Sequence, residues 1–250
     1  ALYPKVCLGP YSLEAAPVMP HERVMRVWGV AALLAGAFAT TPASEVAALR
    51  DFYGALGGDG WLDGDGWNSS RDPCDGSEPW YGIVCSDASS SGATHVVGIT
   101  LQSNQLDGTL PASLANLPRL RTLDLESNKV AGTTPEAICA LRELETLDAR
   151  SNSMSGTIPS CLDNCAKLSF IDYTLNSDPG LSGTIPRSLC ALRSLTALQL
   201  QYTTGLTGTI PDCFGANQPD LYGFGVQGNP VSYTHLRAHE TLRYLVCRLL

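Results

Sequence analysis

Two short stretches of the sequence contain residue types that could bind a metal ion. Residues 63–66 (Asp-Gly-Asp-Gly) offer alternating carboxylates, but Trp67 and Asn68 stand where a calcium-binding EF-hand loop needs its third ligand and its glycine. His235 and His239 are four residues apart, so they would share one face of a helix. Because neither stretch has a complete set of ligands, we predict no metal site and no cofactor.

The sequence also lacks the common signatures of an enzyme. We find no phosphate-binding glycine loop, no protein kinase motifs, and no serine, histidine and aspartate in the order of a known catalytic triad. The chain is therefore expected not to be an enzyme, and its polar residues are considered below as parts of a binding surface.

The composition is typical of a folded, acidic protein. Of the 250 residues, 44% are hydrophobic and 16% are charged, which argues against disorder. The formal net charge of -8 argues against nucleic acid and acidic membrane surfaces as partners, because both require a positively charged surface. A neutral or basic partner fits this charge better.

An apolar stretch near the start of the sequence resembles a secretory signal peptide. Residues 25–39 begin with a positive charge, continue with about thirteen mostly apolar residues, and are followed by small residues suited to cleavage. We expect a signal peptide at residues 25–43 after upstream or leader sequence at residues 1–24. The protein would then be secreted or lie on the extracellular side of the plasma membrane. A retained transmembrane helix is the alternative, although a membrane span needs roughly 20 apolar residues.

A block of the form Gly-Thr-x-Pro recurs along the middle of the chain. Its five copies begin at Gly108, Gly132, Gly156, Gly183 and Gly208, which are separated by 24, 24, 27 and 25 residues. Before each glycine, apolar residues alternate with polar ones, which predicts a short strand followed by a turn. Since one such unit cannot bury its apolar side alone, the units must stack and form a parallel sheet along an inner face.

Two further sets of residues recur with the same period. The asparagines that follow the predicted strands are expected to hydrogen-bond the backbone of neighbouring turns: Asn104, Asn128, Asn152 and Asn176. The core residues of successive strands are expected to line up on neighbouring parallel strands: Leu101, Leu125, Ala149, Tyr173 and Leu200. Both expectations follow from stacking equivalent positions.

Four of the nine cysteines occupy related positions in the repeats. Cys139 and Cys190 lie seven residues after their glycines, whereas Cys161 and Cys213 lie five residues after theirs. In a secreted chain these positions predict the bridges Cys139–Cys161 and Cys190–Cys213 between consecutive turns, with buried free thiols as the alternative. Cys165 stands where other repeats have leucine, so it is expected to be a core residue.

These features resemble the plant-type leucine-rich repeat, whose pattern is LxxLxLxxNxLxGxIPxxLxxLxx. The resemblance covers residues 96–230, about five to six repeats. It implies an α/β fold, a leucine-rich-repeat solenoid: a right-handed superhelix with short parallel strands on the concave face and 3-10 helices or loops on the convex side. Residues 44–95, with Trp-Tyr-Gly-Ile-Val-Cys at 80–85, resemble the N-terminal cap that accompanies such repeats. A helical, disulfide-bonded cap is implied, because an open solenoid end would expose its core.

The flanking regions allow three further predictions. Cys74 and Cys85 match the cap cysteines of the family, so the resemblance implies a Cys74–Cys85 bridge. Asn68 begins an Asn-Ser-Ser sequon and is a predicted glycosylation site. Residues 231–250 depart from the repeat pattern, and we interpret them either as an aberrant, artefactual tail or as an amphipathic helix that covers the end of the core.

Residues between the core positions of each strand are expected to face the concave side, where stacking arranges them in columns. The first column contains Thr100, Asp124, Asp148, Asp172 and Gln199, the second contains Gln102, Glu126, Arg150, Thr174 and Gln201, and Phe170 and Tyr202 are nearby. This mildly acidic surface with two aromatic residues suits a peptide or protein that carries Lys or Arg, or a glycan that stacks on aromatic rings. Alternatively, the aspartates are ordinary solvated residues, since aspartate is common at this position of the repeat.

The resemblance implies extracellular recognition of a protein, peptide or glycan through the concave surface. The module would act either alone or as the N-terminal part of a receptor-like protein, and a membrane would be involved only if a transmembrane span follows. The alternative is a secreted inhibitor of a polygalacturonase-like glycosidase.

Overall fold

The computed structural model describes residues 40–88, 92–176, 178, 180–214 and 217–232. The predicted leader, most of the predicted signal peptide and the tail from residue 233 onward, including both tail histidines, lie outside the described residues. Within the described ranges, no helix combines the length and the apolar character that crossing a membrane requires.

The N-terminal cap is built around a helix and a cluster of aromatic side chains. Helix α1 (Ala43–Ala55) buries Leu49 and Phe52, and a short 3-10 helix, η1 (Gly58–Gly60), follows it. The ring of Phe52 stacks on Trp67 with the ring centroids 6.0 Å apart, and Trp67 contacts Trp80 at 5.4 Å. Such rings bury a large apolar area, and they continue the apolar core of the repeats into the cap, which covers the first repeat.

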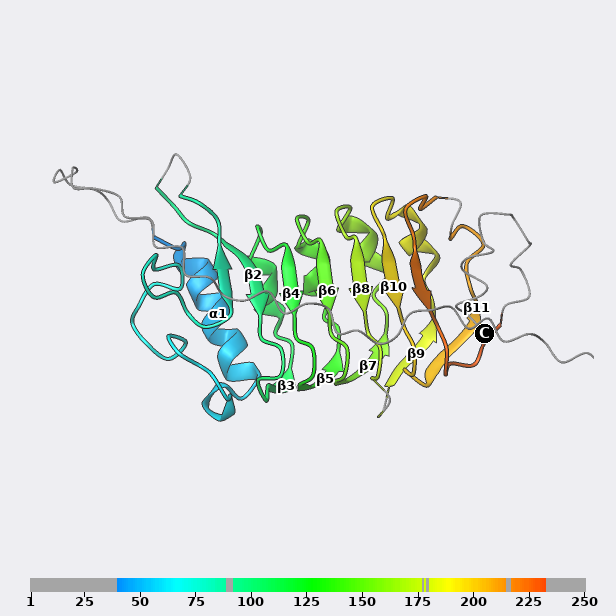
Figure 1. Cartoon of the computed structure of the whole chain (residues 1–250), viewed down its shortest axis with the longest axis horizontal. Helices are drawn as coiled ribbons and strands as arrows, with labels where there is room; N and C mark the ends of the chain where they lie inside the picture. Colours follow the sequence, from blue (N-terminus) through cyan, green and yellow to red (C-terminus); the bar gives the residue numbers. More distant parts are fainter. Residues whose placement is uncertain (1–39, 89–91, 177, 179, 215–216, 233–250) are drawn as a thin grey trace, which may run out of the picture. The chain divides into compact units, whose positions relative to one another are not determined.

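The seven-stranded sheet of Figure 1 carries the predicted strands of the repeats. Its strands run parallel, except that β1, which belongs to the cap, pairs antiparallel with β2. We call the solvent-facing side of this sheet the concave face. In spatial order its strands are β1 (Ile83–Cys85), β2 (Val96–Thr100), β4 (Thr122–Asp124), β6 (Thr146–Asp148), β8 (Phe170–Asp172), β10 (Ala197–Gln199) and β12 (Gly223–Gly225).

A second parallel sheet, which the sequence analysis did not anticipate, is formed by the segments that contain the glycines (Figure 1). It continues to Ser232, two residues past the expected end of the repeats, and Val231 is buried. Its strands are β3 (Asp107–Thr109), β5 (Lys129–Thr133), β7 (Ser153–Thr157), β9 (Gly180–Thr184), β11 (Gly205–Thr209) and β13 (Val231–Ser232).

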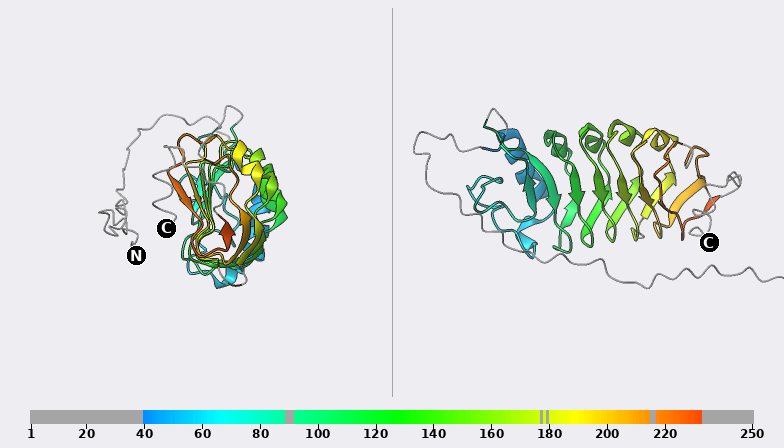
Figure 2. Two further views of the ribbon diagram at one scale, coloured as in Figure 1. Left: turned by 90° about the vertical axis from the view of Figure 1, so that its right-hand side faces the viewer. Right: turned by 45° about the horizontal axis from the view of Figure 1, so that its top comes forward.

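Short 3-10 helices complete the repeats on the side away from the concave face, as the resemblance implied (Figure 2). Each begins directly after the proline of the Gly-Thr-x-Pro block, which lies two residues past the end of the preceding strand and has no N–H to extend the bonding of the sheet. The four helices are η2 (Ala112–Asn116), η3 (Glu136–Ala140), η4 (Ser160–Asn164) and η5 (Arg187–Ala191).

The repeats share one apolar interior. The five core residues that were expected to line up directly follow five neighbouring strands, and all are buried: Leu101, Leu125, Ala149, Tyr173 and Leu200. The backbone N–H of each donates to the carbonyl oxygen of the last strand residue in the next repeat, as from Leu125 to Asp148 at 2.8 Å. The expected alignment on parallel strands is therefore confirmed.

The asparagines form the expected ladder between repeats. The Oδ1 atom of Asn152 accepts the N–H of Val130 in the preceding repeat at 2.8 Å, and its Nδ2 atom donates to the carbonyl oxygen of Leu125 at 2.8 Å. The next asparagines on either side form equivalent bonds. At the first repeat, Asn104 instead bonds the backbone of Asp63 and so joins the solenoid to the cap.

The described residues contain three disulfides, and they are the three pairs expected from the sequence. The Cα atoms are 5.7 Å apart in Cys74–Cys85, 5.6 Å in Cys139–Cys161 and 5.8 Å in Cys190–Cys213, all within the normal range. The first closes the cap and the other two join consecutive turns. Cys165 is a buried free thiol in the core, as its leucine-like position predicted.

Candidate ligand-binding face

The first predicted column is present on the concave face. Thr100, Asp124, Asp148, Asp172 and Gln199 are partners in register on adjacent parallel strands from β2 to β10. Adjacent strands are about 4.8 Å apart, so three carboxylates stand one strand apart in a single row. Asp148 and Asp172 are buried, whereas Asp124 is half-buried.

The second column lies where the chain leaves each strand. Arg150 contacts Glu126 with Nη2 and Oε2 2.6 Å apart, and the Thr174 hydroxyl donates to Oε1 of Gln201 at 2.9 Å. Gln102, at the first position of this column, is exposed and bonds Asp124. Side chains of consecutive repeats therefore bond one another along this column, and they do so at the surface.

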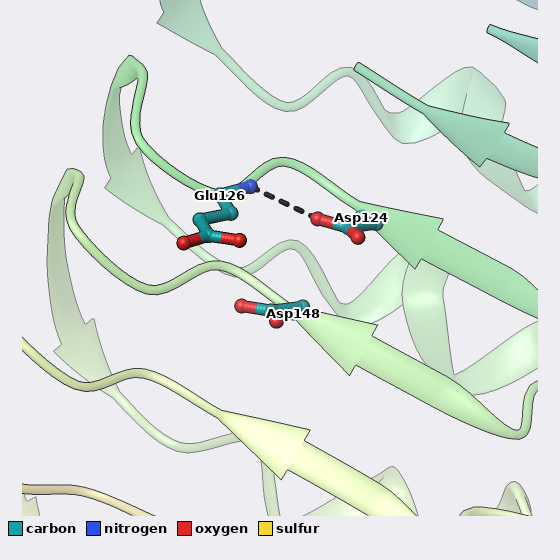
Figure 3. A group of neighbouring side chains, drawn as sticks. All are labelled: Asp124, Glu126 and Asp148. Carbon is teal, nitrogen blue, oxygen red and sulfur yellow. Dashed lines mark hydrogen bonds between the residues drawn. The ribbon is translucent and has the colours of Figure 1, made fainter. Parts of the chain in front are cut away.

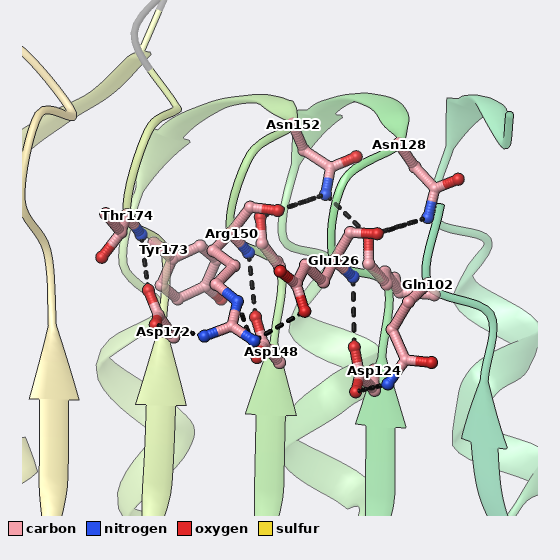
Figure 4. A network of polar contacts seen from close by, with 12 residues as sticks. Gln102, Asp124, Glu126, Asn128, Asp148, Arg150, Asn152, Asp172, Tyr173 and Thr174 are labelled. Atoms are coloured by element: carbon pink, nitrogen blue, oxygen red, sulfur yellow. Dashed lines mark hydrogen bonds and ion pairs between the residues drawn. The ribbon is translucent and has the colours of Figure 1, made fainter. Parts of the chain in front are cut away.

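The aspartates also have a structural role that their positions in the sequence did not reveal (Figure 4). In each repeat, one carboxylate oxygen accepts the backbone N–H two residues later, from Asp124 to Glu126, from Asp148 to Arg150 and from Asp172 to Thr174, at 2.7–3.1 Å. The bond holds the start of the turn. One oxygen of each aspartate is therefore committed to the fold, and the other faces the neighbouring side chains.

Arg150 is the cation at the centre of this acidic row (Figure 4). Besides its bond to Glu126, its Nε atom lies 3.4 Å from Asp148 and its Nη1 atom lies 3.9 Å from Asp172. Four acidic residues, with Asp124 included, thus surround one arginine, whose pKa is raised chiefly by the hydrogen bond with Glu126. The surface keeps an excess of negative charge when all four acids are ionised.

Three of these acids form the tightest carboxylate group in the described part of the chain (Figure 3). One oxygen from each of Asp124, Glu126 and Asp148 lies within 4.8 Å of the others. Arg150 contacts two of the three carboxylates, so the protein itself supplies a cation to this group. An external cation would have to compete with this tethered one.

Burial changes the acidity of the row. Desolvation by burial raises the pKa of Asp148 to about 7, partly opposed by the N–H of Arg150 and its guanidinium. The pKa values of Asp124 and Asp172 are raised for the same main reason. The negative charge of the face therefore grows as the pH rises toward neutrality.

This shift makes a prediction about stability. Because the folded-state pKa of Asp148 lies above its ordinary value of 3.8, the stability linked to this group is fully present at pH values below 3.8 and is lost as the pH rises through about 7. We expect Asp148→Asn to increase the free energy of unfolding at pH 8 by on the order of 2 kcal/mol and to have little effect at pH 4. Urea titrations of both proteins at several pH values measure this, with the exposed Asp212→Asn as control. A variant that is less stable than wild type at pH 8 would contradict the burial argument.

Apolar side chains border the row on the side of the later repeats. Phe170 stands on β8 in register with Thr146 and Ala197, and Tyr202 after β10 is 52% exposed. Leu175 is also 52% exposed. It was not predicted to lie on this face, because the leucine pattern assigns such residues to the core. The face thus combines charge with apolar contact area.

Asn68, the predicted glycosylation site, is exposed in the cap.

Residues 94–154 match the leucine rich repeat family. Together with the two parallel sheets and the helical cap, this match shows that the described part of the chain has a leucine-rich-repeat fold. It resembles the ectodomains of plant receptor kinases.

Three solved structures illustrate this similarity. The ectodomain of the receptor kinase SOBIR1 from Arabidopsis thaliana is 27% identical, with 77% of this chain and 97% of that chain covered and a TM-score of 0.64. The Arabidopsis receptor kinase HAESA, solved with the peptide hormone IDA and the co-receptor SERK1, is 30% identical, with 76% of this chain and 30% of that chain covered and a TM-score of 0.65. A plant ice-binding protein is 28% identical, with 76% of this chain and 57% of that chain covered and a TM-score of 0.64. The chain therefore spans almost all of the first structure but a smaller part of the other two.

Proposed function

We propose that the protein is an extracellular recognition module that binds a peptide or a protein segment carrying Lys or Arg on its concave face. The observation that carries this proposal is the row of Asp124, Asp148 and Asp172 on adjacent strands, which together with Glu126 share one arginine, Arg150. A basic side chain laid across the row would pair with the carboxylate oxygens that the turns do not use.

Three further observations support this proposal. HAESA, which has a similar fold, was solved with a peptide hormone and a co-receptor. In this chain, Phe170 and Tyr202 lie beside the acidic row and offer aromatic contacts to a ligand. The three disulfides are typical of proteins that fold in an oxidising compartment and support an extracellular location, whether free or membrane-attached. The row of acids offers no comparable support for a glycosidase inhibitor.

A displayed library of random linear peptides tests this function. We expect the wild-type chain to enrich peptides with Lys or Arg, and the selected peptides to bind at least about tenfold more weakly to the triple variant Asp124→Asn, Asp148→Asn and Asp172→Asn, a loss of roughly 1.4 kcal/mol. Binding should also weaken with added salt and as the pH falls through about 7, where the buried Asp148 carboxylate takes up a proton.

A matched control removes three acids from the other side of the solenoid. Glu136→Gln, Glu143→Gln and Asp212→Asn change the net charge by the same amount, but these residues belong to the region of the 3-10 helices. If this control weakened binding as much as the concave variant does, long-range charge alone would explain the result. Enrichment of acidic or purely apolar peptides would contradict the proposal.

We infer a second candidate function, binding to ice. It is favoured by the similarity to a plant ice-binding protein and by one feature of this chain, a threonine at the same exposed position in all five Gly-Thr-x-Pro blocks. Inhibition of ice recrystallisation by the purified chain, compared with an equal concentration of albumin, tests this activity.

A further inference from the structure

The exposed side of the second sheet carries an unusually uniform set of residues. The positions directly before and after the five repeat glycines hold six threonines, two serines, one alanine and one aspartate, Asp107. Eight of these ten side chains therefore combine small size with a hydroxyl group, and only the first repeat contributes a charge. We call the five threonines that follow the glycines the threonine ladder: Thr109, Thr133, Thr157, Thr184 and Thr209.

The same contact fixes each step of the ladder. A Cβ atom on Gly156 would lie 2.6 Å from the Cγ2 methyl of Thr133, so this threonine lies directly over the glycine of the next repeat. The corresponding distances from the other threonine methyls are 3.0 Å at Gly132, 3.1 Å at Gly183 and 2.8 Å at Gly208. These glycines have φ angles of +74° to +80°, which side chains rarely adopt. The glycines thus leave room for each threonine to take one repeated position.

The hydroxyl groups of the ladder are available to solvent. All five threonines are exposed, and within the described residues none of their hydroxyls bonds another protein group. Pairing of the strands sets Thr133 beside Ser155, Thr157 beside Ser182 and Thr184 beside Thr207. Hydroxyls of neighbouring strands consequently recur at about the strand spacing of 4.8 Å.

A groove beside the ladder extends the same surface. Its volume is about 630 Å³, and Thr133, Thr157 and Thr184 line it together with Pro135, Pro159 and Pro186. The surface therefore presents hydroxyls for hydrogen bonding and apolar methyl and proline groups that order water without bonding it. Glu136 is the only charged residue of the lining.

We propose that the threonine ladder is the ice-binding site of this protein, and this inference rests on the second candidate function. The spacing between paired strands is close to the shorter oxygen repeat of hexagonal ice, so ladder hydroxyls can take the places of lattice water while the methyl groups order the water between them. Charged or irregular surfaces bind liquid water in other arrangements, which is why the uniform, uncharged ladder and not the acidic concave face is assigned to ice. The ligand of this site is the ice surface.

A pair of double lysine variants tests the site. Thr157→Lys with Thr184→Lys places two long, charged side chains in the middle of the ladder, whereas Ala140→Lys with Ala191→Lys adds the same charge at two exposed 3-10 helix ends. We expect the ladder variant to need at least about tenfold more protein to inhibit ice recrystallisation, and to be excluded from a growing ice hemisphere that incorporates wild type. The helix control should match wild type in both measurements. Circular dichroism melting curves verify that both variants are folded.

The outcomes separate the site from the function. A ladder variant that is folded and fully active, while wild type inhibits recrystallisation, would overturn the ladder as the site and leave ice binding standing. If the ladder and helix variants lost the same amount of ice-recrystallisation inhibition, the assignment of the site to the ladder would also be overturned, because the added charge would then explain the loss. Wild type that neither inhibits recrystallisation nor enters ice would remove the second candidate function, and the ladder assignment with it. Peptide binding on the concave face is unaffected by any of these results.

Discussion

Replacing Asn152 with alanine is expected to lower the free energy of unfolding by about 2–3 kcal/mol. The Asn152 amide accepts the N–H of Val130 and donates to the carbonyl oxygens of Leu125 and Ala149, all in the buried space between repeats. Alanine leaves the buried N–H of Val130 without a partner, which costs about 1–3 kcal/mol, whereas the carbonyl oxygens of Leu125 and Ala149 each lose one of two amide donors and keep the other, from Asn128 and Asn176. Because the bonds of Asn152 outside its own turn all reach the preceding repeat, the loss acts on the interface between these two repeats.

Urea denaturation followed by circular dichroism measures this effect. Asn116→Ala is the matched control, since Asn116 is exposed at the end of η2, and we expect it to change the free energy of unfolding by less than about 0.5 kcal/mol. A broader, two-step transition for Asn152→Ala would fit separation of the solenoid into halves. Equal stability of the two variants would show that water satisfies the freed groups and that the ladder contributes little.

Replacing Cys139 and Cys161 together with serine is expected to destabilise the protein by about 3 kcal/mol. The bridge closes a 22-residue segment, and the loss of chain entropy in the unfolded state on closing a loop of this length corresponds to roughly that amount. Cys139 and Cys161 lie on consecutive turns at η3 and η4, so the bridge also ties two repeats together directly. The destabilised region should be the middle of the solenoid.

Thermal and urea unfolding under oxidising conditions measure the change, and hydrogen exchange locates it. Cys165→Ala is the control, because it removes a buried sulfur without breaking a bridge and should cost only about 1 kcal/mol. Adding a reductant should lower the free energy of unfolding of the wild-type protein to that of the double variant or below it. If the double variant and wild type unfold at the same urea concentration, strain in the bridge cancels its entropic benefit.

Much of the fold could be predicted from residues that recur at a nearly constant spacing along the chain. The spacing of the glycines, the asparagines and the core leucines identified the repeats, their stacking and the row of concave residues, because every copy meets the same neighbours. The pairs Cys139–Cys161 and Cys190–Cys213 followed from the same logic. The second sheet was missed because its strands contain glycine at their centres, which by itself indicates a turn.

The sequence by itself determined the period, the buried residues and the composition of both exposed faces, since these depend on which residue types recur at each position. Only the tertiary structure decided how the members of a face act on one another. Arg150 lies among acids from three different repeats, and burial moves the pKa of Asp148 to about 7. The threonine ladder is regular because each methyl lies over a glycine about two dozen residues away. Distances and desolvation between neighbouring turns set these properties, and no local pattern of residues contains them.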